Sequence, residues 1–292
     1  MSWLQAHLTV DKEQAPLVEA LFESLGALSV TLVDAEDEPM LEPAPGAQPL
    51  WSRTRVTGLF AANQDADLLR SRIDTSLDRD SSRSLVLERL EEQPWERAWL
   101  DHFRPMRFGK RLWICPSGQQ VEAEDAVVVE LDPGLAFGTG THPTTALCLE
   151  WLDGAELEGR TVIDYGCGSG ILAIAALKLG AARVIALDHD PQALLATHEN
   201  ARRNRVDGRL EACLPRDLPS LEADIVLANI LANVLVELAP GILSHLHPAG
   251  ELVLSGILAH QSGEVVSAYR PDIRFGPETR QHEWVRLQGI RQ

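Results

Sequence analysis

The sequence predicts a two-part α/β protein, in which a Rossmann-like, mostly parallel sheet follows a small N-terminal α+β domain of the ferredoxin-like kind. From about residue 113 onward, apolar strand-like runs alternate with helical patterns, as in parallel sheets that are covered on both faces. The first 90 residues instead follow a β-α-β-β-α-β order. A glycine-rich turn, Gly166 to Gly170, connects one apolar run to the helical pattern after it.

Length and charge limit the possible functions. A chain of 292 residues, 45% of them apolar, is long enough for two folded units with substantial cores. Its 43 acidic residues outnumber its 26 basic ones and give a net charge of −17. A broad phosphate-binding surface needs clustered Lys and Arg, so we expect no direct nucleic-acid requirement. A lysine-rich protein would suit this charge better as a partner, although the charge can also simply aid solubility.

Cysteine spacing and hydropathy indicate the compartment. The cysteines, Cys115, Cys148, Cys167 and Cys213, are too far apart for a zinc knuckle or a redox pair, so we interpret them as reduced thiols. The histidines lack acidic or Cys partners at metal spacing, and no metal site is expected. Charges interrupt any possible signal-peptide core, and no long uncharged apolar run occurs elsewhere. We expect a cytoplasmic monomer without a membrane segment.

Residues 1–90 are expected to form the ferredoxin-like domain. A loop rich in Pro and acidic residues, Glu36 to Pro49, interrupts it. Hydrophobic periodicity places its strands and helices on either side of that loop. The strands fit Trp3 to Val10, Leu28 to Val33, Thr54 to Phe60 and Ser84 to Leu90, and the helices fit Pro16 to Leu25 and Asp65 to Leu77.

Residues 91–112 are expected to form a linker helix and connector. Pro94 suits the first turn of a helix, and Trp95, Trp99 and Phe103 recur at four-residue spacing along one face. Four basic residues and no acidic residue follow within the segment from His102 to Arg111. Solvated linker charge explains these residues better than a docking surface does.

Residues 113–292 are expected to form the Rossmann-like domain. Short apolar runs predict its strands, and longer runs with a period of about 3.6 residues predict its helices. The strands fit Val127 to Leu131, Thr161 to Asp164, Val184 to Asp188, Leu210 to Leu214, Asp224 to Asn229 and Leu252 to Ser255; the helices fit Ile171 to Leu179, Pro191 to Asn204, Leu231 to Leu246 and Ala259 to Tyr269.

The glycine turn and the next strand predict a cofactor site. Gly166 and Gly168 allow the backbone to approach a ligand closely, and a parallel sheet places its ligand crevice at the carboxyl ends of its strands. Asp188 ends the following strand, where its carboxylate can accept both hydroxyls of a ribose. A glycine run alone can be a tight turn, but the position of Asp188 at the end of the next strand favours a site for an adenosine-bearing cofactor.

The glycine spacing distinguishes between two such cofactors. A nicotinamide dinucleotide site has its third glycine three residues after the second, whereas this chain has Gly-x-Gly-x-Gly. Asp164 precedes the first glycine by two residues, and it suits an amino acid and a sulfonium better than a pyrophosphate, which it would repel. These features favour S-adenosyl-L-methionine and the sheet of a class I methyltransferase.

Two further segments are expected to converge on this crevice. The loop from Asp132 to Thr145 contains closely spaced glycines and threonines, whose amides and hydroxyls can close over a ligand, and Phe137 can cover the sulfonium. The alternative is a plain connecting loop. Asn229 ends a strand, where it is expected to face the transferred methyl group; the alternative is that it only caps the helix that follows.

Six segments together resemble the bacterial methyltransferases of large-subunit ribosomal protein L11 over nearly the whole chain. They are Trp95 to Trp99, Pro105 to Gly109, Leu131 to Thr145, Asp164 to Gly170, Asp188 to Pro191 and Asn229 to Leu231. The resemblance implies S-adenosylmethionine contacts at Thr145, Gly166, Asp188 and Asn229, with substrate recognition by the N-terminal domain. It also implies up to three methyl groups on lysine side chains and on the N-terminal α-amine. One departure is Arg205, where similar sequences have Gly.

Other functions share the cofactor half of the chain. A methyltransferase that acts on another protein, a small molecule or RNA would have the same motif and a different N-terminal domain; the acidic charge disfavours RNA. A non-catalytic module would bind the cofactor yet release no S-adenosylhomocysteine with any substrate. Many amine methyltransferases follow the polar strand-end residue with Pro-Pro-aromatic, whereas this chain has Ile230-Leu231-Ala232 after Asn229.

Overall fold

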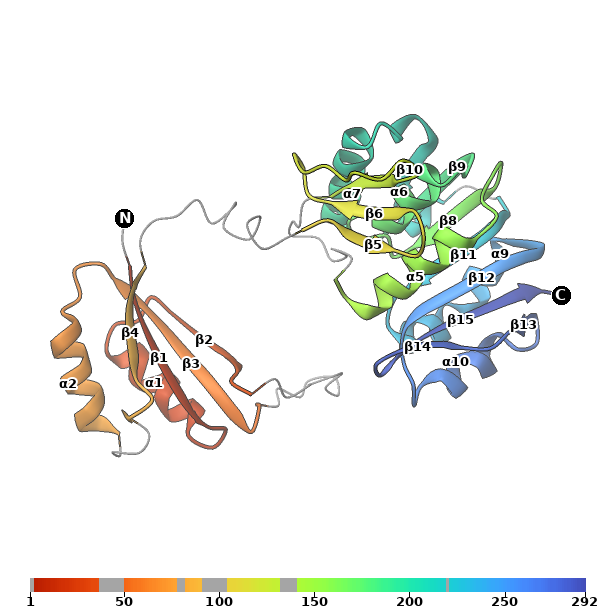
Figure 1. Cartoon of the computed structure of the whole chain (residues 1–292). Coiled ribbons are helices and arrows are strands. Elements are labelled where there is room, and N and C mark those ends of the chain that lie inside the picture. The colour runs from red at the N-terminus through yellow and green to blue at the C-terminus, as the bar shows by residue number, and fades with distance from the viewer. Residues whose placement is uncertain (1–2, 37–49, 78–81, 91–103, 132–140, 219–220) are drawn as a thin grey trace. The chain divides into compact units, whose positions relative to one another are not determined.

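The computed structural model describes residues 3–36, 50–77, 82–90, 104–131, 141–218 and 221–292. The chain divides into two compact units, Met1–Ala98 and Trp99–Gln292 (Figure 1). Each unit has its own hydrophobic core. The linker helix that Pro94 predicts lies outside the described residues.

The N-terminal unit is an antiparallel sheet packed against two helices. The strand order is β2-β3-β1-β4, and all three pairings are antiparallel. This order confirms the predicted ferredoxin-like fold. The elements are β1 (Trp3–Asp11), α1 (Ala15–Ser24), β2 (Ser29–Asp34), β3 (Arg53–Ala61), α2 (Ala66–Ser76) and β4 (Val86–Leu90).

The core of this unit is built from strands in which buried and more exposed residues alternate. Every second residue of β1 is buried, so one face of the sheet meets the helices. Phe22 of α1 and Phe60 of β3 pack edge to face, with ring centroids 5.9 Å apart. A Cβ at Gly58 would lie 2.6 Å from the Phe22 ring, so only glycine lets this aromatic pair reach the sheet.

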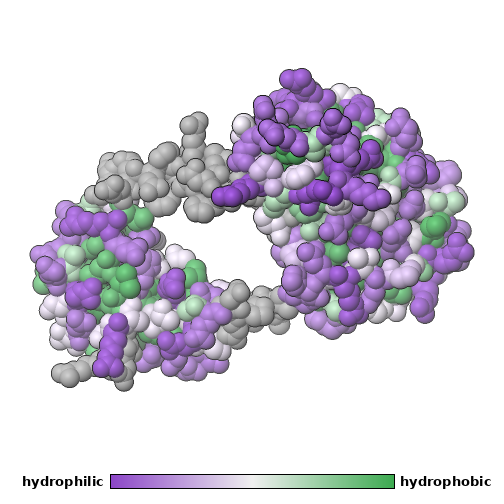
Figure 2. Space-filling view, viewed as in Figure 1, coloured by the Kyte–Doolittle hydropathy of each residue, from purple (hydrophilic) through white to green (hydrophobic). Residues whose placement is uncertain are grey.

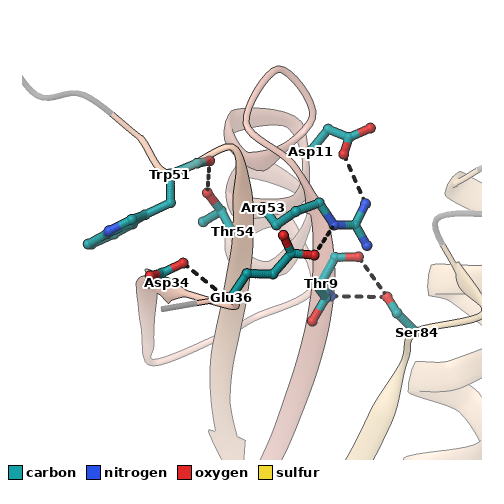
Figure 3. A network of polar contacts seen from close by, with 8 residues as sticks. All are labelled: Thr9, Asp11, Asp34, Glu36, Trp51, Arg53, Thr54 and Ser84. Atoms are coloured by element: carbon teal, nitrogen blue, oxygen red, sulfur yellow. Dashed lines mark hydrogen bonds and ion pairs between the residues drawn. The ribbon is translucent and has the colours of Figure 1, made fainter. Parts of the chain in front are cut away.

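Polar contacts at one end of the sheet explain why β4 is shorter than predicted (Figure 3). The Ser84 hydroxyl accepts a hydrogen bond from the Thr9 backbone N–H and donates one to the Thr9 carbonyl, both at 3.0 Å. A side chain therefore binds the backbone of β1 here, and the strand ladder begins only at Val86. Beside it, Arg53 forms exposed ion pairs with Asp11 and Glu36, which contribute little to stability.

The C-terminal unit contains an eight-stranded sheet in the order β10-β9-β8-β11-β12-β15-β13, with β14 paired to β15. The first five of these strands are parallel, and β13, β14 and β15 are antiparallel. The strands are β8 (Thr161–Tyr165), β9 (Arg183–Leu187), β10 (Leu210–Cys213), β11 (Ala223–Asn229), β12 (Leu246–Leu258), β13 (Ile273–Phe275), β14 (Thr279–Gln281) and β15 (Trp284–Arg291).

Helices cover both faces of this sheet, which confirms the predicted Rossmann-like architecture. The adjacent residues Val162 and Ile163 of β8 belong to two different core clusters, one on each face. The first cluster contains residues of α5, α6 and α7, and the second contains residues of α8, α9 and α10. The bounds are α5 (Pro143–Gly154), α6 (Ile171–Lys178), α7 (Pro191–Arg203), α8 (Ala232–Glu237), α9 (Ala239–Ser244) and α10 (Ser262–Tyr269).

A three-stranded sheet lies over α5 and α6. It consists of β5 (Met106–Phe108), β6 (Leu112–Cys115) and β7 (Val127–Glu130) in that order. The strands β5 and β6 were not predicted, and the second unit begins before residue 113. The residues of α6 from Ile171 to Leu177 are all buried, because this extra sheet covers the face that would otherwise meet solvent.

Asp153, at the end of α5, attaches the β5–β6 hairpin. Its carboxylate accepts hydrogen bonds from the backbone N–H groups of Lys110, Arg111 and Leu112, at 2.5, 3.3 and 3.0 Å. Gly109 has a φ of +67°, and a Cβ there would lie 2.4 Å from the same carboxylate. The hairpin turn is therefore part of the C-terminal unit.

The C-terminal end of the chain departs from the prediction in two ways. The helix expected from Leu231 to Leu246 is two short helices, because Leu238 ends α8 and Pro240 lies in the first turn of α9. The antiparallel strands β13, β14 and β15 were not predicted. Within the described ranges, no helix has both the length and the apolar character needed to cross a membrane.

Candidate active site

A pocket of about 530 Å³ opens at the carboxyl ends of β8, β9 and β11. The strand order reverses between β8 and β11, and a doubly wound sheet binds its ligands at this switch point. The pocket walls are mostly apolar, as is typical of cofactor sites. Its lining residues include Tyr165, Gly166, Leu187, Asp188, Asn229, Ile230, Leu231, Val234, Leu238, Gly256, His142 and Trp284.

The glycine turn forms the floor of the pocket beside β8. The backbone N–H groups of Gly166 and Cys167 both donate to the Leu187 carbonyl, at 2.7 and 2.8 Å, which ties the turn to the end of β9. Gly166 has a φ of +78°, and a Cβ there would lie 2.3 Å from Ile230 Cγ2. A side chain at this position would collide with Ile230, so the close approach between this turn and the residue after β11 requires glycine.

Two polar side chains of α7 hold the turn from behind. The Thr197 hydroxyl donates to the Gly168 carbonyl at 3.0 Å, and the Asn200 amide donates to the Ser169 carbonyl at 2.9 Å. The N–H of Gly168 belongs to the preceding peptide group and donates to the Asp188 carboxylate at 2.9 Å. The predicted residue Gly168 is therefore linked to the pocket through the contact between its backbone and Asp188.

Asp188 lies on the pocket wall just after β9. One carboxylate oxygen accepts a hydrogen bond from the Gly168 N–H at 2.9 Å, and the other accepts one from the Asp190 N–H at 3.0 Å. Asp188 is only 9% exposed. Each carboxylate oxygen can accept a further hydrogen bond, so the geometry supports the predicted role of Asp188 in binding two vicinal hydroxyls.

Asp164 lies behind the turn and is not among the pocket-lining residues. One carboxylate oxygen accepts the Ala173 N–H of α6 at 3.1 Å, and the other has no hydrogen-bond partner. The pKa of Asp164 is raised to about 7, mainly by burial; the hydrogen bond from Ala173 lowers the pKa in part, and the nearby charge of Asp188 raises it. The structure therefore places this predicted contact residue one layer behind the pocket.

Asn229 lines the pocket at the end of β11, and its amide nitrogen donates to the Thr145 hydroxyl at 3.2 Å. Thr145 is buried in the first turn of α5 and does not itself line the pocket. The N-cap of α8 is Leu231, so Asn229 is not the cap of that helix. Because Thr145 fixes the amide, the Asn229 carbonyl oxygen can present a hydrogen-bond acceptor to a ligand.

Several residues that line the pocket were not singled out from the sequence. His142 caps α5 by accepting the Thr144 N–H, and its ring packs edge to face on Trp284, with centroids 4.9 Å apart. Burial lowers the pKa of His142, while Glu283 raises it. Trp284 belongs to β15, whose alternating pattern of Val285, Leu287 and Gly289 was the signal that could have revealed a strand. The predicted cover Phe137 lies outside the described residues, as does the rest of segment 132–140.

Comparison with known proteins identifies the family. The family model described as ribosomal protein L11 methyltransferase (PrmA) matches residues 2–292. The chain belongs to this family.

Its relatives match over their whole length. A protein named ribosomal protein L11 methyltransferase from Methylococcus capsulatus is 55% identical over 290 residues, which are 99% of each chain. A protein of the same name from Azotobacter vinelandii is 54% identical over 292 residues, the whole of both chains. The crystal structure of a ribosomal protein L11 methylase from Lactobacillus delbrueckii subsp. bulgaricus has a TM-score of 0.58 and 34% identity, and covers 65% of this chain and 100% of that one.

Proposed function

We propose that this protein transfers methyl groups from S-adenosyl-L-methionine to lysine side-chain amines and to the N-terminal α-amine of ribosomal protein L11. The whole-length match to the L11 methyltransferase family carries this proposal. The pocket supports it independently, because the turn at Gly166, the carboxylate of Asp188 and the amide of Asn229 meet there.

The residues present fit this cofactor. Glycine at position 166 lets the turn lie against Ile230 on the pocket wall, where a Cβ would collide with the Ile230 side chain. Asp188 would hold the ribose hydroxyls, and the apolar wall that includes Leu187 would enclose the adenine. When bound, S-adenosylmethionine supplies a methyl group on a sulfonium, which makes that methyl electrophilic.

The attacking amine must be neutral, and the pocket favours the neutral form. A lysine with an ordinary pKa of about 10.4 is neutral at pH 7 in only about one molecule in 2,500, a handicap of roughly 4.6 kcal/mol, whereas an α-amine near 7.8 has a handicap of about 1 kcal/mol. The apolar walls formed by Leu231, Val234 and Trp284 would lower the pKa of an amine by desolvation. The amine can then lose its proton to solvent.

Asn229 would orient the amine. Its carbonyl oxygen would accept one hydrogen bond from the neutral amine, while the bond to Thr145 keeps the amide from rotating. After Asn229 the chain has Ile230-Leu231-Ala232 rather than Pro-Pro-aromatic. This less enclosed wall would let a partly methylated amine turn and react again, in keeping with repeated methylation.

We assign recognition of the ribosomal protein to the N-terminal ferredoxin-like domain, residues 1–90, because none of the pocket-lining residues comes from it. The catalytic half would act without nucleic acid and as a monomer. All four cysteines are free thiols, as expected for a protein that meets its ribosomal substrate in the cytoplasm.

The test is mass spectrometry of purified ribosomal protein L11 after incubation with the full-length protein and isotopically labelled S-adenosylmethionine. We expect labelled methyl groups, up to three per amine, on lysine side chains and on the N-terminal α-amine. The Asn229→Ala variant is the matched control and should transfer far less label. No label on L11 from a folded wild-type protein that binds the cofactor would refute the proposed substrate.

A further inference from the structure

Cationic side chains gather at the C-terminal ends of α6 and α7, although the whole chain carries a net charge of −17. Residues 200–209 contain four arginines and one aspartate. Lys178 ends α6, Arg202 lies in the last turn of α7, and Arg205 follows that helix. All three side chains are exposed, and hydrophilic residues dominate the visible surface around α7 and β10 (Figures 1 and 2).

Contacts place two more arginines at the same edge. The Arg209 guanidinium donates to the carbonyls of Leu177 and Ala181, at the C-terminal end of α6. Arg183 and Arg209 together line a surface depression of about 380 Å³. We call Lys178, Arg183, Arg202, Arg205 and Arg209 the cationic edge.

Negative charge compensates only part of this edge. Arg183 is paired with Glu211, but no acidic side chain of the described residues lies within ion-pair distance of Lys178, Arg202 or Arg205. Burial lowers the pKa of Lys178; nearby Glu130 raises it and nearby Arg205 lowers it. The like charges of Lys178 and Arg205 are therefore close enough to interact.

The backbone at Arg205 shows that a cation is tolerated where glycine would fit better. The Val206 N–H donates to the Ala201 carbonyl and the Arg205 N–H to the Arg202 carbonyl, the two bonds of a Schellman motif. Arg205 occupies its left-handed position, with a φ of +59°, where glycine is the usual residue. Lys178 and Arg202 already complement the helix dipoles, so the dipoles do not require a cation at position 205.

We propose that the cationic edge binds the phosphate backbone of RNA. Arg202 and Arg205 carry the proposal, because both are exposed and neither has an acidic side chain of the described residues within ion-pair distance; such guanidinium groups bind phosphates well. The choice of RNA rests on the proposed function, because a ribosomal protein lies among RNA in the ribosome. The edge lies at the amino ends of β9 and β10, opposite the carboxyl ends where the pocket opens. Bound RNA would therefore leave the pocket accessible.

The acidity of the chain does not prevent such binding. At physiological ionic strength, exposed charges separated by more than about 8 Å are largely screened from one another. A phosphate at the edge therefore responds mainly to the local arginines and Lys178. We expect binding that depends on this local charge to be weak at high salt.

Fluorescence anisotropy of the full-length protein with a labelled single-stranded oligouridylate tests the proposal. Binding should weaken as salt rises, and the logarithmic slope should be about −2 to −3.5 if three to five phosphates are contacted. The double variant Arg202→Glu and Arg205→Glu should lose at least about tenfold in affinity. The matched control is the double variant Arg270→Glu and Arg274→Glu, which reverses the charge of two exposed arginines away from the edge. It should bind RNA as the wild type does.

The variant Arg205→Gly separates charge from folding. It relieves the left-handed backbone, so its unfolding temperature should rise while its RNA affinity falls. Affinity that is independent of salt, an equal loss in the Arg270 and Arg274 control, or preference for phosphatidylserine vesicles over RNA would overturn the proposal. The same variants should methylate isolated L11 at the wild-type rate. If the wild-type protein itself does not methylate L11, the proposed substrate is wrong, and this result is independent of the RNA-binding measurement.

Discussion

Asp188 shows how one side chain can both shape a turn and face a ligand. Its carboxylate is already bound by two backbone N–H groups, which fix its orientation on the pocket wall. We expect Asp188→Ala to weaken S-adenosylmethionine binding by about 1.5–3 kcal/mol, because a charge-assisted contact to two hydroxyls is lost. Calorimetry on the folded variant measures this loss.

Asp190→Ala is the matched control for Asp188. Asp190 is exposed and caps α7 through the Gln192 N–H, so its loss should lower stability by about 1 kcal/mol without changing affinity. An unchanged dissociation constant in Asp188→Ala would remove Asp188 from the cofactor site.

Asn229 is expected to affect turnover more than cofactor affinity. Its hydrogen bond to an amine matters most when that amine attacks, so Asn229→Ala should slow methyl transfer by roughly a hundredfold and change the cofactor dissociation constant by less than about threefold. Single-turnover kinetics on L11 measures the transfer step. Thr145→Val, which removes the partner of the Asn229 amide, should slow transfer by a smaller factor; a rate within about twofold of wild type in Asn229→Ala would exclude a positioning role.

Asp164 should make stability depend on pH. Its pKa is raised by burial to about 7 from an unfolded value of 3.8, so the folded protein binds the additional proton. Stability therefore falls as pH rises through the window from about 4 to 7, by up to about 4 kcal/mol at about 1.4 kcal/mol per pKa unit. Denaturant unfolding of the ligand-free protein at pH 5 and pH 8 measures this. Asp164→Asn cannot ionise and should show a flatter pH profile; parallel profiles would refute the assignment.

At the scale of elements, some strands were predictable because their pattern is local. The strands β8, β9 and β11 are apolar on both faces and each ends at a polar residue or a glycine turn, so periodicity and the motif located them together. The strands β5 and β6 are only three and four residues long and are separated by a charged turn. Their stability comes from α5 and α6, which no local pattern reveals.

The difference between local patterns and tertiary contacts also explains which residues of the candidate site were predicted from the sequence. Gly166, Asp188 and Asn229 were found because parallel strands bring their carboxyl ends to one edge. His142 and Trp284 meet through a ring contact between residues that are distant in sequence, on α5 and on the unpredicted β15. Asp164 lies within β8 but is not among the pocket-lining residues, because periodicity locates the end of a strand and not the direction of each side chain near that end.

The attachment of the β5–β6 hairpin can be tested through Asp153. Asp153→Ala removes the acceptor for three backbone N–H groups that are tied to a buried carboxylate. We expect a loss of about 2–4 kcal/mol in the free energy of unfolding. Chemical denaturation measures it, with Glu156→Ala as the control because Glu156 is exposed nearby on the same segment. Equal stabilities for the two variants would show that the hairpin does not depend on Asp153.

At the scale of the whole molecule, net charge and local charge lead to different expectations. The value of −17 argued against a nucleic-acid partner, and the pocket itself gives no reason for one. The cationic edge is visible only when the ends of α6 and α7 are brought together by the fold. Composition therefore describes the average surface, whereas a docking site depends on which residues the fold makes neighbours.

The division of labour between the two units gives the last prediction. A fragment of residues 99–292 contains every pocket-lining residue and both of its own core clusters. It should bind S-adenosylmethionine within about threefold of the full-length affinity, a difference below about 0.7 kcal/mol. It should nevertheless fail to methylate L11, because the surface that we assign to substrate recognition has been removed.

A second fragment of residues 113–292 is the matched control. It lacks β5 and the first residue of β6, so the apolar surface that Phe108 and Leu112 cover on α5 becomes exposed. Removing these two buried side chains should destabilise the fragment by several kcal/mol, at about 1.5–3 kcal/mol each. Thermal unfolding and calorimetry compare the two fragments directly. If the longer fragment methylates L11 at the full-length rate, recognition lies in the C-terminal unit. If the shorter fragment is equally stable, β5 and Leu112 are dispensable for its fold.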